Sequence, residues 1–135
     1  MVNAVANSIV PKITIVIGNS YGAGNYAMCG KAYDPRFIYA WPSAKIAVMG
    51  GDQAAKTLLQ IQVSDKKLSQ AEQQELLDKI KSRYEKQTTP YYAAARLWVD
   101  DIIDPADTRK VISEGIAAAN NNAEMEDLKL GVFQV

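Results

Sequence analysis

A short run of small residues carries the most distinctive chemistry in this sequence. The apolar, β-branched stretch ITIVIG (13–18) leads directly into NSYGAG (19–24). When a strand ends in such a loop before a helix, the first backbone N–H groups of the helix have no internal partners, and glycine lets another group approach them closely. Ser20–Gly24 could therefore stabilise an oxyanion, each donor contributing ~3 kcal/mol in a transition state. The alternative is a tight turn with glycine chosen for packing.

A second glycine-containing turn has the same layout. AVMGGDQAA (47–55) reads as strand, paired glycines and helix start, so it is another candidate donor site, although we expect Gly50 and Gly51 mainly to turn the chain. The motifs GxGxxG and GxxxxGK[ST] are both absent. The sequence therefore gives no support to nucleotide-phosphate binding.

Reactive side chains are scarce, and most have a structural explanation. Asp104 and Asp107 stand at an expected helix start, and Cys29 lies among small apolar residues, as a buried small hydrophobe would. We expect no metal site. Two further carboxylates are Asp100 and Asp101. The aromatic residues could line a cofactor but are expected mainly in the core: Tyr33, Phe37, Tyr39, Trp41, Tyr91, Tyr92 and Trp98.

Composition narrows the function classes. The chain has 135 residues, one domain's worth, with 15 basic and 15 acidic residues that cancel, so no nucleic acid or membrane partner is expected. One cysteine and no histidine exclude an internal disulfide, Ser-His-Asp and Cys-His catalysis, and His-containing zinc motifs. Any catalysis must use carboxylates, lysine, tyrosine or the backbone.

The elements that would position these groups alternate between strand and helix, which predicts an α/β fold. Strands are expected at 12–18, 37–41 and 44–50, and helices at 2–10, 24–32, 52–62 and 69–86, with the linker SDKK (64–67) between the last two. A further helix begins after Thr89 with Pro90 in its first position. The last is expected after Asp104, with Pro105 first, and ends at 120–122, followed by an extended LGVFQV (130–135).

Two blocks of the sequence resemble a known family. SYGAGNYAMCGKAYDPRFIYAWPSAKIAVMGGDQAA (20–55) and PYYAAARLWVDDIIDPADTRKVISEGIAAAN (90–120) resemble the C-terminal part of the carboxyltransferase β subunit of biotin-dependent acyl-CoA carboxylases. The methylcrotonoyl-CoA branch is the most similar, with the geranyl-CoA branch beside it. LGVFQV resembles the family's final residues, and only 62–88 are generic.

The resemblance implies a crotonase-like fold, a spiral of ββα units with extra C-terminal helices. It also implies that residues 1–135 are a single partial domain, the C-terminal part of the carboxyltransferase C-domain. MVNAVANSIVPK resembles an internal segment of the family, so we expect that Met1 is not a natural start. Such a fragment is expected to be inactive alone.

The family's activity supplies a role for the small-residue loop. The resemblance implies transfer of a carboxyl group from carboxybiotin to an acyl-CoA, with 3-methylcrotonyl-CoA favoured, as in leucine catabolism, and propionyl-CoA as the other candidate. One oxyanion hole in the N-terminal domain holds the thioester enolate, and a second in the C-terminal domain polarises the biotin ureido oxygen. Matching the motif puts this second hole at the N–H groups of Ala23 and Gly24, within a biotin-binding Tyr21–Gly24 segment.

The resemblance also implies partners. These are an acyl-CoA substrate, the N-terminal carboxyltransferase domain of a neighbouring subunit in a homohexamer, and a biotin carboxylase and biotin carrier α subunit. Biotin would be attached to the carrier and not to this chain, in a bacterial cytoplasm or a mitochondrial matrix. Two alternatives stay open: a related biotin-dependent acyl-CoA decarboxylase subunit, and a scaffold without catalytic function.

Overall fold

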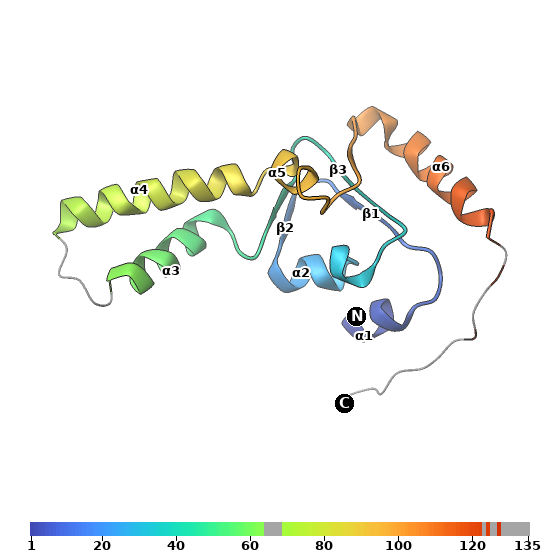
Figure 1. Cartoon of the computed structure of the whole chain (residues 1–135), viewed down its shortest axis with the longest axis horizontal. Coiled ribbons are helices and arrows are strands. Elements are labelled where there is room, and N and C mark those ends of the chain that lie inside the picture. Colours follow the sequence, from blue (N-terminus) through green and yellow to red (C-terminus); the bar gives the residue numbers. More distant parts are fainter. Residues whose placement is uncertain (64–68, 123, 125–126, 128–135) are drawn as a thin grey trace.

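The computed structural model describes residues 1–63, 69–122, 124 and 127. It has a small parallel-stranded core, from which a pair of long helices projects to one side while the last helix lies on the other (Figure 1). The expected linker SDKK and the expected extended LGVFQV lie outside the described residues.

The core consists of two successive ββα units. The first contains β1 (Ile13–Val16), β2 (Asn19–Tyr21) and α2 (Gly22–Ala27). The second contains β3 (Phe37–Ala40), β4 (Lys45–Ala47) and α3 (Gly51–Val63).

Equivalent strands of the two units pair in parallel. β1 pairs with β3, with Ile13 opposite Phe37, and β2 pairs with β4, with Asn19 opposite Lys45. The short strand β5 (Asp101–Ile102) continues the first sheet on the free edge of β3. Each ββα unit therefore lies directly against its predecessor, and the α/β spiral expected from the sequence is confirmed.

The core is small, and its members lie between residues 16 and 99 of the sequence. Its buried members come from the two ββα units and from the segment around α5 (Pro90–Ala94). They are Val16, Ile38, Ala40, Ala44, Ala93 and Val99. Because α5 and Val99 close this cluster, the later part of the sequence completes the core that the strands begin.

The helix α6 (Thr108–Asn120) packs on the sheet face formed by the first residues of β1 and β3. A Cβ atom at Gly115 would lie 2.8 Å from Cδ1 of Ile13 and 3.3 Å from Phe37, so glycine allows the helix to approach closely. The indole Nε1 of Trp41 donates to Thr108 Oγ1 at 2.9 Å and fixes the start of the helix.

The helices α3 and α4 (Gln70–Gln87) pack along one another and project from the core (Figure 1). The predicted capping box is confirmed, because Glu72 N–H donates to Ser69 Oγ and Ser69 N–H donates to the Glu72 carboxylate. The ion pair between Lys81 and Asp52 joins the two helices at 2.7 Å. The hydrogen bond and charge of Lys81 lower the pKa of Asp52, and Asp52 raises the pKa of Lys81 for the same reasons.

Several predicted boundaries were wrong at the amino-terminal end. The expected helix 2–10 ends earlier, as α1 (Val2–Asn7), because Ser8 is extended and the Lys12 ammonium donates to the carbonyls of Ser8 and Val5. The expected helix 24–32 begins at Gly22 and ends at Ala27, and a separate 3₁₀ turn, η1 (Lys31–Tyr33), follows. A left-handed residue at Cys29, with φ of 62°, separates them.

The predicted start of the last helix was partly right, because Asp104 caps and Pro105 takes the first position as expected, but the turn that they begin is separate from the helix. Asp104 and Pro105 begin a 3₁₀ turn, η2 (Pro105–Asp107), in which the Asp104 carboxylate accepts from Ala106 N–H at 2.8 Å. The helix α6 starts only at Thr108, and Asp107 occupies its N-cap without a side-chain hydrogen bond to it. The Thr89 cap with Pro90 in the first helical position is confirmed, since Tyr92 N–H donates to Thr89 Oγ1 at 3.2 Å.

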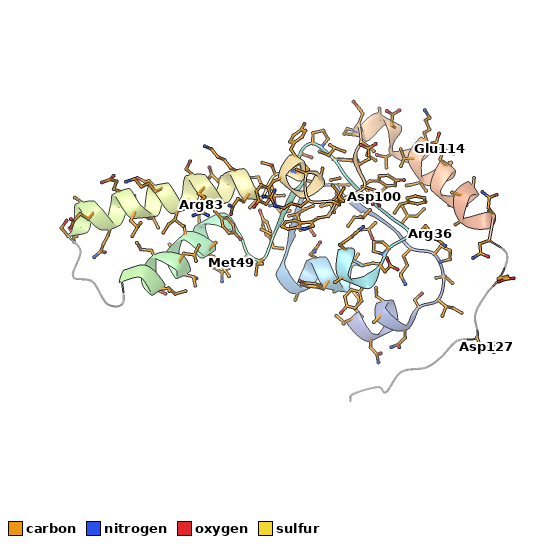
Figure 2. All side chains as sticks on the ribbon, viewed as in Figure 1. Arg36, Met49, Arg83, Asp100, Glu114 and Asp127 are labelled. Atoms are coloured by element: carbon orange, nitrogen blue, oxygen red, sulfur yellow. The ribbon has the colours of Figure 1, made fainter. Side chains whose placement is uncertain are left out.

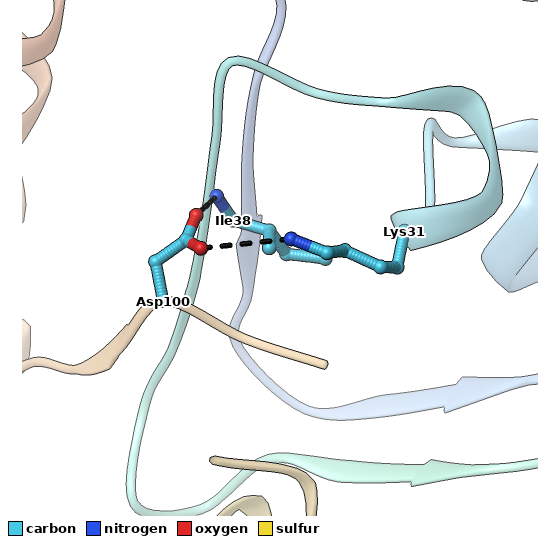
Figure 3. Close-up of polar contacts among 3 residues, drawn as sticks. All are labelled: Lys31, Ile38 and Asp100. Carbon is cyan, nitrogen blue, oxygen red and sulfur yellow. Dashed lines mark hydrogen bonds and ion pairs between the residues drawn. The ribbon is translucent and has the colours of Figure 1, made fainter. Parts of the chain in front are cut away.

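The carboxylate of Asp100 has a structural role at the edge of β3 (Figure 3). It accepts from Ile38 N–H at 2.8 Å and lies 3.6 Å from the Lys31 ammonium, while Asp100 N–H donates to Ile38 carbonyl at 2.8 Å. Asp100 therefore satisfies both main-chain polar groups of Ile38 just before β5 pairs with β3. This arrangement agrees with the structural explanation favoured for these carboxylates.

Candidate functional site

The Tyr21–Gly24 segment forms the turn from β2 into α2, and we call it the donor turn. Tyr21 is the N-cap, with extended backbone angles, and no side chain caps the helix. No described residue accepts a hydrogen bond from the N–H groups of Ala23 or Gly24. Both residues are exposed. The turn therefore presents two free main-chain donors at the surface.

The sequence at the donor turn determines this geometry through Gly22. Its φ of +52° is a left-handed conformation that side-chain-bearing residues rarely adopt. A Cβ atom there would also lie 2.7 Å from the carbonyl oxygen of Val48. Glycine is thus required twice, once for the backbone angle and once for contact with the segment after β4.

The parallel pairing of β2 with β4 brings the two glycine-containing turns together. Val48 lies against Gly22, and a Cβ atom at Gly50 would lie 3.8 Å from the ring of Tyr21. These turns are about two dozen residues apart in the sequence, but both follow strands that run side by side in the same direction. The second candidate donor site therefore forms the wall of the first.

The start of α3 is less suited to an anion than the donor turn. Asp52 lies in its first turn, paired with Lys81, and the carboxylate places negative charge where an oxyanion would have to bind. Ala54 N–H donates to Gly50 carbonyl at 2.9 Å, within the helix start. This agrees with the expectation that Gly50 and Gly51 mainly turn the chain.

Two polar side chains brace the donor turn from its inner side. Ser20 Oγ donates to the side-chain oxygen of Asn25 at 2.9 Å, across the turn. A Cβ atom at Gly30 would lie 2.8 Å from Asn25, so the chain after α2 closes tightly on this side chain. Sequence reasoning missed Asn25, because its only signal was a polar residue after the glycines.

Exposed apolar side chains lie on α2 and beside the donor turn. Tyr26 is 49% exposed, Met28 66% and Val48 76%. Single exposed apolar residues are ordinary, but these three follow the donor turn directly or contact it. Apolar side chains therefore lie close to the two free N–H groups.

The remaining candidates lie away from the donor turn or have structural partners. Cys29 is buried, as expected. Phe37 and Tyr39 stack on the sheet at 5.9 Å, and burial followed by the nearby carboxylates raises the pKa of Tyr39. Tyr92 and Trp98 form an edge contact at 6.0 Å near α5. A third edge contact joins Tyr33 to Tyr26 at 6.4 Å, so the ring contacts among the described residues are separate pairs and form no common wall. The expected core location was wrong for Tyr91 and Trp98, which are exposed.

No three His, Cys, Asp or Glu side chains within the described ranges gather in a way that could hold a metal ion. None of the helices in these ranges is long and apolar enough to cross a membrane. The chemistry that the site offers is hydrogen bonding from the main chain. Because α2 has only six residues, its dipole adds little, and the donors act as individual N–H groups.

Residues 1–131 match the family described as the carboxyl transferase domain. A probable methylcrotonoyl-CoA carboxylase beta chain, mitochondrial, from Drosophila melanogaster is 51% identical over 140 aligned positions, which cover 100% of this chain and 24% of the relative. The chain thus spans about a quarter of the length of the curated relatives it matches.

Two of the solved structures that share its fold are a carboxylase subunit and a transcarboxylase subunit. The beta subunit of geranyl-CoA carboxylase from P. aeruginosa has a TM-score of 0.78 and 42% identity, with 99% of this chain and 25% of that chain covered. A hexameric transcarboxylase 12S with hydrolysed methylmalonyl-coenzyme A bound has a TM-score of 0.79 and 34% identity, with 98% and 24% covered. The expected crotonase-like fold of the carboxyltransferases is confirmed.

Proposed function

The chain belongs to the carboxyl transferase domain family, and from this membership we propose that it forms the biotin-side half of an acyl-CoA carboxyltransferase. In this proposal residues 1–135 are a single partial domain, the C-terminal part of the family's second domain. The observation that carries it is the exposed pair of main-chain donors at Ala23 and Gly24, in the turn that the family motif marks.

The residues of the donor turn fit a neutral or anionic carbonyl oxygen. Two adjacent N–H groups without partners can donate to one oxygen, and the left-handed Gly22 orients them outward without a side chain in the way. Carboxybiotin, when bound, would supply the carboxyl group that is transferred. This chain would hold its ureido oxygen with the Ala23 and Gly24 N–H groups, and Tyr21 and Gly22 would form the adjoining surface.

These donors account for catalysis without histidine. The Ala23 and Gly24 N–H groups, already in position, would stabilise negative charge on the ureido oxygen more than they stabilise the neutral oxygen of the ground state. In this proposal the chain would contribute this stabilisation through main-chain groups alone. Biotin would come on a carrier belonging to a biotin carboxylase α subunit.

We favour 3-methylcrotonyl-CoA over propionyl-CoA as the acceptor, which would place the reaction in leucine catabolism. Identity is higher to the methylcrotonoyl relative than to the transcarboxylase with a methylmalonyl ligand. The acyl-CoA would be held by the N-terminal carboxyltransferase domain of a neighbouring subunit in a homohexamer. A mitochondrial matrix or a bacterial cytoplasm would fit, since the Drosophila relative is named as mitochondrial.

The test is the substitution Ala23→Pro in the complete subunit assembled with its α subunit. Proline removes one N–H and is tolerated in the first turn of a helix, so we expect transfer to fall about 100-fold or more with assembly intact. Ala71→Pro is the matched control, because Ala71 is also exposed in the second position of a helix. Ala23→Gly keeps the N–H and should retain activity.

The outcomes separate the alternatives. Full activity of an assembled Ala23→Pro enzyme would remove the site assignment. A subunit that assembles but never transfers carboxyl groups, in any variant, would favour the scaffold. Recovery of membrane subunits in place of a biotin carboxylase in a pull-down would favour the decarboxylase.

A further inference from the structure

The hydroxyl of Tyr84 holds both main-chain polar groups of Met49. It donates to Met49 carbonyl at 2.8 Å and accepts from Met49 N–H at 3.3 Å. Tyr84 lies near the end of α4, and Met49 follows β4, so the contact joins segments that are far apart in the sequence. Figure 2 labels Met49 where the chain passes from the strands into α3. The Tyr84 hydroxyl thus supplies the donor and the acceptor that a neighbouring strand would supply in a sheet.

Met49 lies between the two residues that touch the donor turn. On one side, the Val48 carbonyl oxygen presses on Gly22, where a Cβ atom would be only 2.7 Å away. On the other side, Gly50 lies against the ring of Tyr21. Fixing the main chain of Met49 therefore fixes the wall against which the donor turn rests.

A hollow of about 170 Å³ also lies between the donor turn and α4. Tyr21 from the donor turn and Tyr84 from α4 line it together with Gly51 and Thr88. Since the two tyrosines face one space, a shift of either changes the surroundings of the other.

Two further contacts tie the end of α4 to this region. Ile46 N–H in β4 donates to the carbonyl of the buried Thr88 at 2.9 Å, and Lys81 pairs with Asp52 beyond the glycines. Among the described residues of α4, Tyr84 is the one whose side chain hydrogen-bonds to the turn that contacts Gly22. The polar contacts of α4 with Ile46 and Asp52 lie before and after that turn.

We propose that Tyr84 is a positioning residue for carboxyl transfer: through Met49 it holds the Val48 carbonyl against Gly22 and so orients the Ala23 and Gly24 N–H groups. This inference rests on the proposed function. Tyr84 touches no reacting atom in this scheme. Losing its hydroxyl would leave Met49 unpaired and let the wall move, and misplacing a catalytic donor by about 1 Å can cost up to about 100-fold in rate.

The experiment is Tyr84→Phe in the complete subunit assembled with its α subunit. We expect kcat for transfer between 3-methylglutaconyl-CoA and free biotin to fall about 10-fold to 100-fold. The KM for the acyl-CoA and the ATP-dependent carboxylation of biotin should stay within about twofold, because neither uses the donor turn. Tyr91→Phe is the control, since Tyr91 is 63% exposed and its hydroxyl has no partner among the described residues.

A double-mutant cycle measures the coupling in kcat between two substitutions, which a purely structural role of Tyr84 would not produce. Gly22→Ala and Tyr84→Phe should be strongly non-additive in kcat, because both act on the orientation of the same donors. Wild-type kcat in Tyr84→Phe, or additive effects of the two substitutions, would overturn the inference. The proposed function would still stand if Ala23→Pro were inactive. Equal losses in both half-reactions, or loss of assembly in Tyr84→Phe, would also overturn it. Full activity of Ala23→Pro would remove the proposed function and this inference together.

Discussion

At the scale of single residues, a positive φ angle is favourable at Gly22 and strained at Leu97. Gly22 uses the left-handed conformation where glycine has no steric penalty, and a contact with Val48 explains why the turn needs it. Leu97 has a φ of 58°, although its branched side chain makes this conformation unfavourable. Its side chain is 78% exposed. The two residues have similar positive φ angles, but only Gly22 is the residue type that usually adopts them.

Leu97 lies three residues after α5, in a left-handed position that glycine normally takes after a helix. Leu97 N–H donates to Ala94 carbonyl and Trp98 N–H donates to Ala93 carbonyl, each at 2.9 Å, which is the hydrogen-bond pattern of a left-handed helix end. The left-handed conformation costs a residue like leucine about 1–2 kcal/mol. Glycine avoids this cost but loses part of the gain through its greater freedom in the unfolded chain.

We therefore predict that Leu97→Gly stabilises the protein by about 0.5–1 kcal/mol. Chemical denaturation with an unchanged m value measures this change. Leu97→Ala is the control, because alanine keeps the strain and removes the same exposed side chain. A glycine variant no more stable than the alanine variant would show that the exposed leucine contributes contacts that offset its strain.

At the scale of elements, side chains complete what the strands leave unpaired. The parallel sheets are short, so polar groups at their edges find partners in residues from distant segments. Asp100 pairs with the main chain of Ile38 before β5 begins, and Tyr84 pairs with Met49 after β4 ends. In both cases a side chain adds hydrogen bonds just outside the regular strand pairing, before β5 in one case and after β4 in the other.

We predict that Asp100→Ala costs about 1–3 kcal/mol of unfolding free energy, because Ile38 N–H, next to a buried side chain, loses its acceptor. Asp100→Asn keeps an acceptor oxygen and loses only the charge, so it should cost less than half as much. The Lys31 pair is exposed at the surface, and Lys31→Met should change stability by well under about 1 kcal/mol. Chemical denaturation of the three variants measures these differences, and equal costs for alanine and asparagine would contradict the hydrogen-bond explanation.

At the scale of the whole molecule, the proposed function gives this chain one side of a reaction that needs two. It covers about a quarter of the length of its relatives, and its two free donors open onto the surface beside exposed apolar residues. If the acyl-CoA is held by another part of the complete subunit, this chain has the means to polarise one reactant and none to hold the other.

We predict that the 135-residue chain alone transfers no carboxyl group from 3-methylglutaconyl-CoA to free biotin, and that adding the family's N-terminal carboxyltransferase half in trans restores transfer. Ala23→Pro in the short chain should abolish the restored activity, because it removes a donor that the other half cannot replace. Activity of the short chain by itself would contradict the half-site proposal. If the mixture showed no carboxyl transfer although both parts were folded and associated, another substrate or the scaffold would be favoured.

Local signals in the sequence predicted much of this structure correctly. The capping box at Ser69 and Glu72, the Thr89 cap and a strand within 12–18 were all identified, since each depends on residues within one turn or one strand. The expected full burial of that strand was wrong, because only Val16 of β1 is buried. The donor turn was identified for the same reason, as a run of small residues after an apolar strand. Its free N–H groups follow from helix geometry, which holds in any fold.

Only the tertiary structure decided which segments meet. Asn19–Tyr21 was expected as a loop and is a strand because β4 lies beside it, and β5 exists only because β3 has a free edge. The same pairing places Val48 against Gly22 and allows Tyr84 to reach Met49. The sequence by itself determined the local geometry of the turns, because caps and glycines act on their own neighbours. It did not reveal what supports the donor turn, because contacts between distant residues depend on how the whole chain closes, and no local pattern records that.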